Sequence, residues 1–157
     1  MKKVLFVCWG NICRSPSAEA VFKDLVKKRG VENEFEIDSA GTIAAHSGEK
    51  ADPRMQQHAA QRGYSLDSIS RKINPKIDFD RFDYIVAMDD YNLSDLMDMA
   101  RNDVDLKKIT KMTDYSKNYN YSSVPDPYYG GTDGFELVLD LLEDASSGLF
   151  DHIQQER

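Results

Sequence analysis

The chain has 157 residues, of which 41% are hydrophobic and 30% charged, as expected of a single globular domain spanning residues 1–157. Its net charge of −7 disfavours non-specific binding to nucleic acid, which depends on basic residues that neutralise phosphates. No apolar run approaches the roughly 20 residues of a membrane span, so we expect no membrane-spanning segment.

The first predicted elements are a strand, a loop and a helix. Val4–Val7 is a continuous β-prone apolar run, which is typical of a strand buried on both faces of a parallel sheet. The polar loop Cys8–Ser15 follows. Apolar residues then recur at helical spacing from Pro16, with Ser15 as the expected N-cap and Gly30 as the stop.

The same alternation continues to the end of the chain. In order, we expect a strand over residues 35–40, a loop over 41–52, a helix over 53–62 closed by Gly63, a strand over 84–88, a helix capped by Asp89 or Asp90, a strand over 109–112, a polar loop over 113–132 and a long helix opened by the capping-box sequence of residues 133–136. The predicted fold class is therefore α/β, a single-domain three-layer sandwich with a four-stranded parallel sheet and helices on both faces. Its functional site is expected at the carboxyl ends of the strands.

The loop after the first strand carries the strongest chemical signal. It reads Cys8-Trp9-Gly10-Asn11-Ile12-Cys13-Arg14-Ser15. A short loop that enters a helix directs several backbone N–H groups into one concavity, which binds anions. Gly10 permits a close backbone approach, and Arg14 offers a planar fork that matches two phosphate oxygens. These groups favour the thiolate of Cys8, so the loop predicts a phosphate-binding site with a cysteine nucleophile.

The residues of this loop and its helix, from Cys8 to Glu19, resemble the N-terminal signature of the low-molecular-weight protein tyrosine phosphatases. Further similar segments follow in the same order along nearly the whole chain: residues 39–42, 52–54, 82–85, 88–89 and 126–130. The resemblance implies hydrolysis of phosphotyrosine in a protein substrate through a cysteinyl-phosphate intermediate. It also implies inhibition by phosphate, vanadate or similar oxyanions.

The resemblance assigns roles to individual residues. Cys8 is the nucleophile, Arg14 and the loop amides from Trp9 to Ser15 bind the phosphate, and Asp126 acts as general acid and then as general base. The Ser15 hydroxyl stabilises the Cys8 thiolate, and Asn11 holds the shape of the loop through Ser39. The residues alone do not choose Asp126 over the other acidic residues of the chain, and its alternative role is a turn before Pro127. Asp89 could be a helix cap or a supporting residue.

Aromatic side chains are expected to form the walls of the substrate cleft. Tyr128 and Tyr129 match the aromatic wall of the family. Trp9 is the only tryptophan, and many relatives carry a smaller apolar residue there, whereas many carry tryptophan where this chain has Ala45. One wall is therefore expected to have moved to Trp9.

The two cysteines exclude a disulfide framework and favour a cytoplasmic location. Cys13 is either a packing residue or a resolving thiol that traps oxidised Cys8. Because His46, His58 and His152 do not have metal-binding spacing, and nucleotide-binding glycine motifs are absent from the sequence, we expect no metal ion and no cofactor.

Three alternatives remain open. A protein-arginine phosphatase of the same family tends to have threonine where this chain has Ile12, so tyrosine is favoured. An arsenate reductase would need further cysteines near residues 80–90, and the chain has none there. A non-catalytic phosphate-binding module is disfavoured because Cys8, Arg14 and Asp126 are all present.

Overall fold

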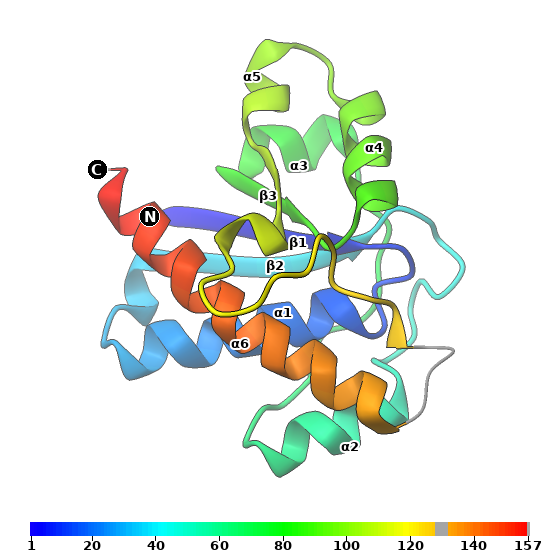
Figure 1. Ribbon diagram of the computed structural model, residues 1–157. Coiled ribbons are helices and arrows are strands. Elements are labelled where there is room, and N and C mark those ends of the chain that lie inside the picture. Colours follow the sequence, from blue (N-terminus) through cyan, green and yellow to red (C-terminus); the bar gives the residue numbers. More distant parts are fainter. Residues whose placement is uncertain (128–131, 157) are drawn as a thin grey trace.

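A computed structural model describes residues 1–127 and 132–156 (Figure 1). Four parallel strands form one sheet in the order β2-β1-β3-β4. The strands are β1 (Lys2–Cys8), β2 (Phe35–Gly41), β3 (Tyr84–Ala87) and β4 (Ile109–Lys111). Strand β1 lies at the centre of the sheet, and its residues 4–7 are fully buried, as a strand covered on both faces requires.

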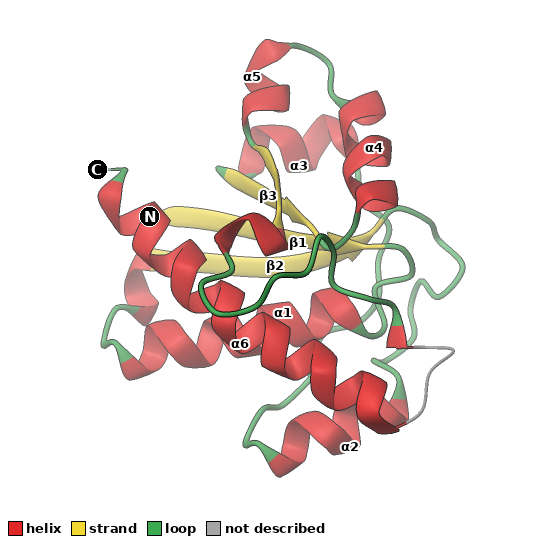
Figure 2. Ribbon diagram, in the orientation of Figure 1, coloured by secondary structure: helices red, strands yellow, loops and turns green. Residues whose placement is uncertain are grey.

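Helices cover both faces of this sheet (Figures 1 and 2). One face carries α1 (Arg14–Lys28) and the long α6 (Thr132–Gln155), with α2 (Pro53–Gln61) packed against α6. The other face carries α3 (Pro75–Arg81), α4 (Asp90–Met99) and α5 (Asp103–Lys107). Two 3₁₀ turns, η1 (Glu32–Glu34) and η2 (Met112–Tyr115), complete the order. The predicted three-layer α/β sandwich is confirmed.

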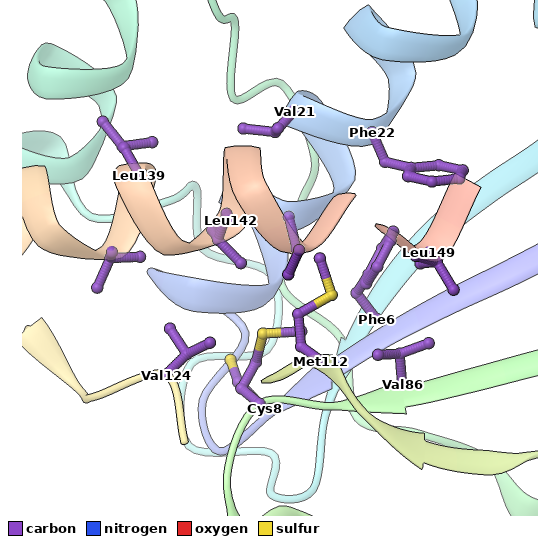
Figure 3. Packing of buried hydrophobic residues seen from close by; sticks show 14 of the residues in the cluster. Phe6, Cys8, Val21, Phe22, Val86, Met112, Val124, Leu139, Leu142 and Leu149 are labelled. Atoms are coloured by element: carbon purple, nitrogen blue, oxygen red, sulfur yellow. The ribbon is translucent and has the colours of Figure 1, made fainter. Parts of the chain in front are cut away.

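The main hydrophobic core lies between the sheet, α1 and α6 (Figure 3). Phe6 of β1 packs edge-on against Phe22 of α1, with ring centroids 5.7 Å apart. Cys8 belongs to the same cluster, so its side chain packs against the core (Figure 3). Among the described residues, no helix has the length and apolarity to cross a bilayer.

The structure corrects the predicted start of α1. Ser15 is not its N-cap, because the helix already begins at Arg14, with Cys13 in the cap position and no side-chain cap bond. The Ser15 hydroxyl instead lies 3.0 Å from the Cys8 sulfur. A tertiary partner has therefore replaced the local backbone contact that the Ser-Pro pair suggested.

Other boundaries differ by one to three residues, and two short helices had not been predicted. Helix α3 begins at Pro75 behind its cap Asn74, and α5 is capped by Asn102. Asp89, rather than Asp90, caps α4 through its side chain. The polar segment after β4 starts with the η2 turn rather than with irregular chain.

Candidate active site

The loop after β1 is held by hydrogen bonds from segments distant in sequence. The carbonyl oxygens of Cys8 and Trp9 accept the backbone N–H groups of Thr42 and Ile43, at 3.0 and 3.2 Å. Other contacts reach the Gly10 and Ile12 carbonyls: the Ser70 hydroxyl donates to Gly10 at 2.8 Å, and the Asp52 N–H donates to Ile12 at 2.8 Å. The loop is therefore fixed by the rest of the domain.

Close packing of β2 against the loop requires a glycine. A Cβ atom placed on Gly41 would lie 2.7 Å from the carbonyl oxygen of Trp9, which is closer than such atoms approach in proteins. The end of β2 thus packs directly against the backbone of the loop at Trp9.

Asn11 fixes the shape of the loop from inside. Its φ angle of 57° lies in the left-handed region, which asparagine tolerates better than most residues. Its side-chain amide nitrogen donates to the hydroxyls of Ser15 and Ser39, at 2.7 and 3.0 Å, while its oxygen accepts the N–H of Arg71 at 3.0 Å. The structure thus brings together Asn11 and Ser39 as predicted.

Arg14 is almost fully buried and is oriented by two acceptors. Its Nη1 donates to the Asp89 carboxylate at 2.6 Å and to the Val124 carbonyl at 3.1 Å. Burial acts to lower the pKa of Arg14, but neighbouring Cys8 and hydrogen-bonded Asp89 raise that pKa above its ordinary value. The guanidinium is therefore a permanent positive charge beside the Cys8 sulfur.

Asp126 lines the same cavity as Cys8 and Arg14. Its Oδ2 is 3.8 Å from Nη2 of Arg14, and its side chain is 37% exposed. A cavity of about 190 Å³ is lined by Cys8, Trp9, Gly10, Ile12, Cys13, Arg14, His46 and Asp126. Trp9, which is 46% exposed, forms part of its rim. Tyr128 and Tyr129 lie outside the described residues.

Cys13 also lines the cavity, and its thiol ionises less readily than that of an exposed cysteine. It is buried, and this burial raises the pKa of its thiol, with the nearby carboxylate of Asp52 raising it further. Cys8 and Cys13 are both free cysteines. Cys13 is therefore a protonated thiol close to the end of β1.

Sequence reasoning missed three contributors to the site. His46 lines the cavity and bonds to Glu49 through Nδ1 at 2.9 Å. Arg71 holds Asn11 through its backbone, and Glu19 accepts a hydrogen bond from Ser39 at 2.6 Å. Only Glu19 carried a sequence signal, because a charged residue occupies the face of α1 that also carries apolar residues.

Within residues 1–127 and 132–156, no group of three or more His, Cys, Asp or Glu side chains could hold a metal ion. Among the described residues that line the cavity, Arg14 supplies a guanidinium and Asp126 a carboxylate, and Asp89 contacts this guanidinium. The guanidinium suits an anion, and the carboxylate can exchange a proton with it.

Comparison with known proteins agrees with this geometry. The family model for low molecular weight phosphotyrosine protein phosphatases matches residues 3–157. The chain belongs to this family. It is accordingly an enzyme of the protein-tyrosine-phosphatase class.

Relatives of this phosphatase come from bacteria and eukaryotes. A low molecular weight protein-tyrosine-phosphatase of Streptomyces coelicolor is 43% identical over 98% of this chain and 94% of its own. A crystal structure of a protein tyrosine phosphatase from Entamoeba histolytica, with Hepes in the active site, is 45% identical over 99% of both chains, with a TM-score of 0.96. A solved structure named as a Drosophila arginine phosphatase is 36% identical over 98% of both chains, with a TM-score of 0.89.

Proposed function

We propose that this phosphatase hydrolyses phosphotyrosine in protein substrates, with Cys8 as nucleophile and Asp126 as general acid and base. The observation that carries the proposal is the shared cavity, in which the Cys8 sulfur, the Arg14 guanidinium and the Asp126 carboxylate meet at the carboxyl end of β1. Anion binding, nucleophilic attack and proton transfer each have a group there.

Backbone geometry supports the assignment of the loop as the phosphate cradle. In a trans peptide, the C=O of one residue and the N–H of the next point in opposite directions. The carbonyls of Cys8, Trp9, Gly10 and Ile12 are bonded to segments around the loop, and no described peptide bond is cis. The N–H groups of the residues that follow them are therefore directed away from those segments, toward the cavity. Arg14 adds its charge to this group of donors.

The chemical steps follow from these positions. The Cys8 thiolate attacks phosphorus and the bond to the tyrosyl oxygen breaks, while Asp126 gives its proton to the leaving phenolate. A water molecule then attacks the cysteinyl-phosphate, Asp126 takes a proton from that water, and inorganic phosphate leaves as the thiolate is restored. Arg14 and the loop amides stabilise the phosphoryl oxygens in both steps. Phosphate and vanadate inhibit because they occupy the same cradle.

The walls of the cavity favour an aryl phosphate. Trp9 and Ile12 line the same cavity as Cys8 and add apolar surface to it, which suits the ring of phosphotyrosine. The nucleophile is 3% exposed, so a long side chain reaches it better than a short phosphoserine does. We include Tyr128 and Tyr129 in this wall as a proposal from the sequence alone.

A substrate comparison tests the proposal. We expect hydrolysis of a phosphotyrosyl peptide and of an aryl phosphate, unchanged by a chelator, with kcat/KM at least about 100-fold above that for the same peptide bearing phosphoserine. Phosphoarginine is the second candidate, because a similar structure is named as an arginine phosphatase. Faster release of phosphate from a phosphoarginyl peptide than from the phosphotyrosyl peptide would replace tyrosine by arginine as the substrate. Absence of hydrolysis of every ester would contradict the proposed activity.

We further propose that Cys13 protects Cys8 during oxidation. Peroxide converts the Cys8 thiolate to a sulfenic acid and is itself reduced to water. The Cys13 thiol then attacks the sulfenic sulfur, a second water leaves and a disulfide forms. A reducing compartment such as the cytoplasm returns both residues to the thiols seen here.

Replacement of Cys13 by serine is expected to make inactivation by peroxide irreversible. In the unmodified protein, dithiothreitol should restore most activity after mild oxidation, and mass spectrometry should find a Cys8–Cys13 bond. In Cys13→Ser, Cys8 should advance to the sulfinic acid, which thiols do not reduce. Equal recovery of both proteins would show that Cys13 serves packing alone.

A further inference from the structure

Glu19 is a buried carboxylate for which the mechanism above has no use. It lies on α1, is 6% exposed, and has both oxygens occupied. Oε1 accepts from the Ser39 hydroxyl at 2.6 Å, and Oε2 accepts from Lys23 Nζ at 2.5 Å. Burial of a charged group is unfavourable unless partners compensate for the lost water. A role for Glu19 is therefore to be sought in its hydrogen bond with Ser39 and in the contacts that Ser39 makes.

The bond to Glu19 sets the direction of the next hydrogen bonds. A serine hydroxyl has one hydrogen, and Ser39 gives it to Glu19 because a carboxylate only accepts. The Ser39 oxygen is therefore the acceptor for the Asn11 amide nitrogen, at 3.0 Å. The Asn11 oxygen is held by the N–H of Arg71, so both ends of this amide have a fixed identity.

The second hydrogen of the Asn11 amide reaches Ser15. The distance from Asn11 Nδ2 to Ser15 Oγ is 2.7 Å, and Ser15 is the acceptor there because the amide nitrogen only donates. The Ser15 hydrogen is then available for the Cys8 sulfur, 3.0 Å away, with the Ala40 carbonyl as a more distant alternative at 3.4 Å.

We propose that Glu19 is a positioning residue, which acts through Ser39, Asn11 and Ser15 so that the Ser15 hydroxyl donates its hydrogen to the Cys8 sulfur. The inference rests on the proposed function in one respect, namely that Cys8 reacts as a thiolate. Without Glu19 the Ser39 hydrogen has no acceptor at that position and its hydroxyl can rotate. The amide of Asn11 then loses a fixed partner, and the Ser15 hydrogen is shared between Cys8 and Ala40.

The rate of Cys8 alkylation tests whether the Ser15 hydroxyl donates to the Cys8 sulfur, and this measurement does not require the enzyme to turn over a substrate. Iodoacetamide is neutral, so it reports thiolate reactivity rather than anion binding, and mass spectrometry separates Cys8 from Cys13. At pH 6 we expect Glu19→Ala to be alkylated at Cys8 about tenfold more slowly than the unmodified protein, the scale of one lost hydrogen bond to a charged group. Glu19→Gln keeps an oxygen for Ser39 and should stay within about threefold of the unmodified protein.

Two controls separate positioning from structural support. Asp24 lies on the same helix and pairs with Lys28 at 2.8 Å, so Asp24→Ala removes an α1 carboxylate that is not part of this series of hydrogen bonds. It should leave the alkylation rate unchanged. In a Ser39→Ala background, Glu19→Ala should slow alkylation by less than about twofold more, because residues that act through one another are not additive.

The alkylation rates of these variants either support or overturn the role of Glu19. Equal alkylation rates for Glu19→Ala and Asp24→Ala would overturn the proposal, as would full additivity with Ser39→Ala. If Glu19→Ala does not fold, Glu19→Met, which keeps the length of the side chain without an acceptor oxygen, takes its place: an alkylation rate about tenfold below that of the unmodified protein supports the proposal, and an unchanged rate overturns it. Failure of the unmodified protein to hydrolyse any phosphate ester would reject the proposed function while leaving these alkylation rates readable.

Discussion

Replacement of Cys8 by serine is expected to lower kcat by at least about 10⁴-fold, the order found when an enzyme loses its nucleophile. A serine hydroxyl remains protonated at neutral pH, and the chain offers no base within the loop to activate it. Release of phosphate from an aryl phosphate, followed over hours at high enzyme concentration, provides the measurement.

Binding of an oxyanion should survive the same change. The loop amides and Arg14 are untouched in Cys8→Ser, so calorimetry should find phosphate affinity close to that of the unmodified protein. Arg14→Lys is the opposite control, since a point charge cannot replace a planar fork with two donors, and it should lose that affinity. Retention of near-normal turnover in Cys8→Ser would remove Cys8 from the role of nucleophile.

The second large effect is expected at Asp126. Loss of a general acid lowers rates by about 10²–10⁴-fold, so Asp126→Ala should reduce kcat by that order for substrates with poor leaving groups. The loss should shrink for an activated aryl phosphate, whose phenolate leaves without a proton. A series of phenyl phosphates with increasing leaving-group acidity measures this dependence.

Asp89 provides the matched comparison for Asp126. It is a second carboxylate beside Arg14, but its two oxygens are engaged by the guanidinium and by the N–H of Asn92. Asp89→Ala should therefore reduce rates without a dependence on the leaving group. A leaving-group dependence that changes in Asp89→Ala and not in Asp126→Ala would transfer the role of acid to Asp89.

The local sequence pattern was sufficient to predict β1, the loop that follows it and α1, which together hold the candidate active site. The run of apolar residues in β1, the polar loop and the spacing of α1 are all contained in about 30 consecutive residues, and their chemistry follows from the order of residue types. The four strands were found for the same reason. Short polar helices such as α3 and α5 have no comparable apolar period, since α5 buries a single residue, Asp105.

The partners of the site residues could not be predicted from local pattern. Arg14 and Asp89 are 75 positions apart, and Arg71 reaches Asn11 across 60 positions. The first pair exists only once the sheet has placed the ends of β1 and β3 side by side, and the second only once the Arg71 backbone has paired with Gly41 at the end of β2. The error at Ser15 has a related origin, because contacts made within the folded loop, with the Cys8 sulfur and the Asn11 amide, took the hydroxyl that local rules assigned to a helix cap.

Asp89 shows how the fold limits the ways in which this enzyme can change. One of its oxygens accepts the N–H of Asn92 in the first turn of α4, while the other accepts a hydrogen bond from the Arg14 guanidinium. A substitution there alters a helix cap, worth about 1 kcal/mol in proteins, and the orientation of Arg14 in the same step. Selection for a more stable α4 and selection for a different phosphate geometry therefore act on one side chain. Variants at this position that improve either the stability of α4 or the orientation of Arg14 are expected to need a compensating change elsewhere. Changes in substrate preference should therefore arise more readily at rim residues such as Trp9 than at Asp89.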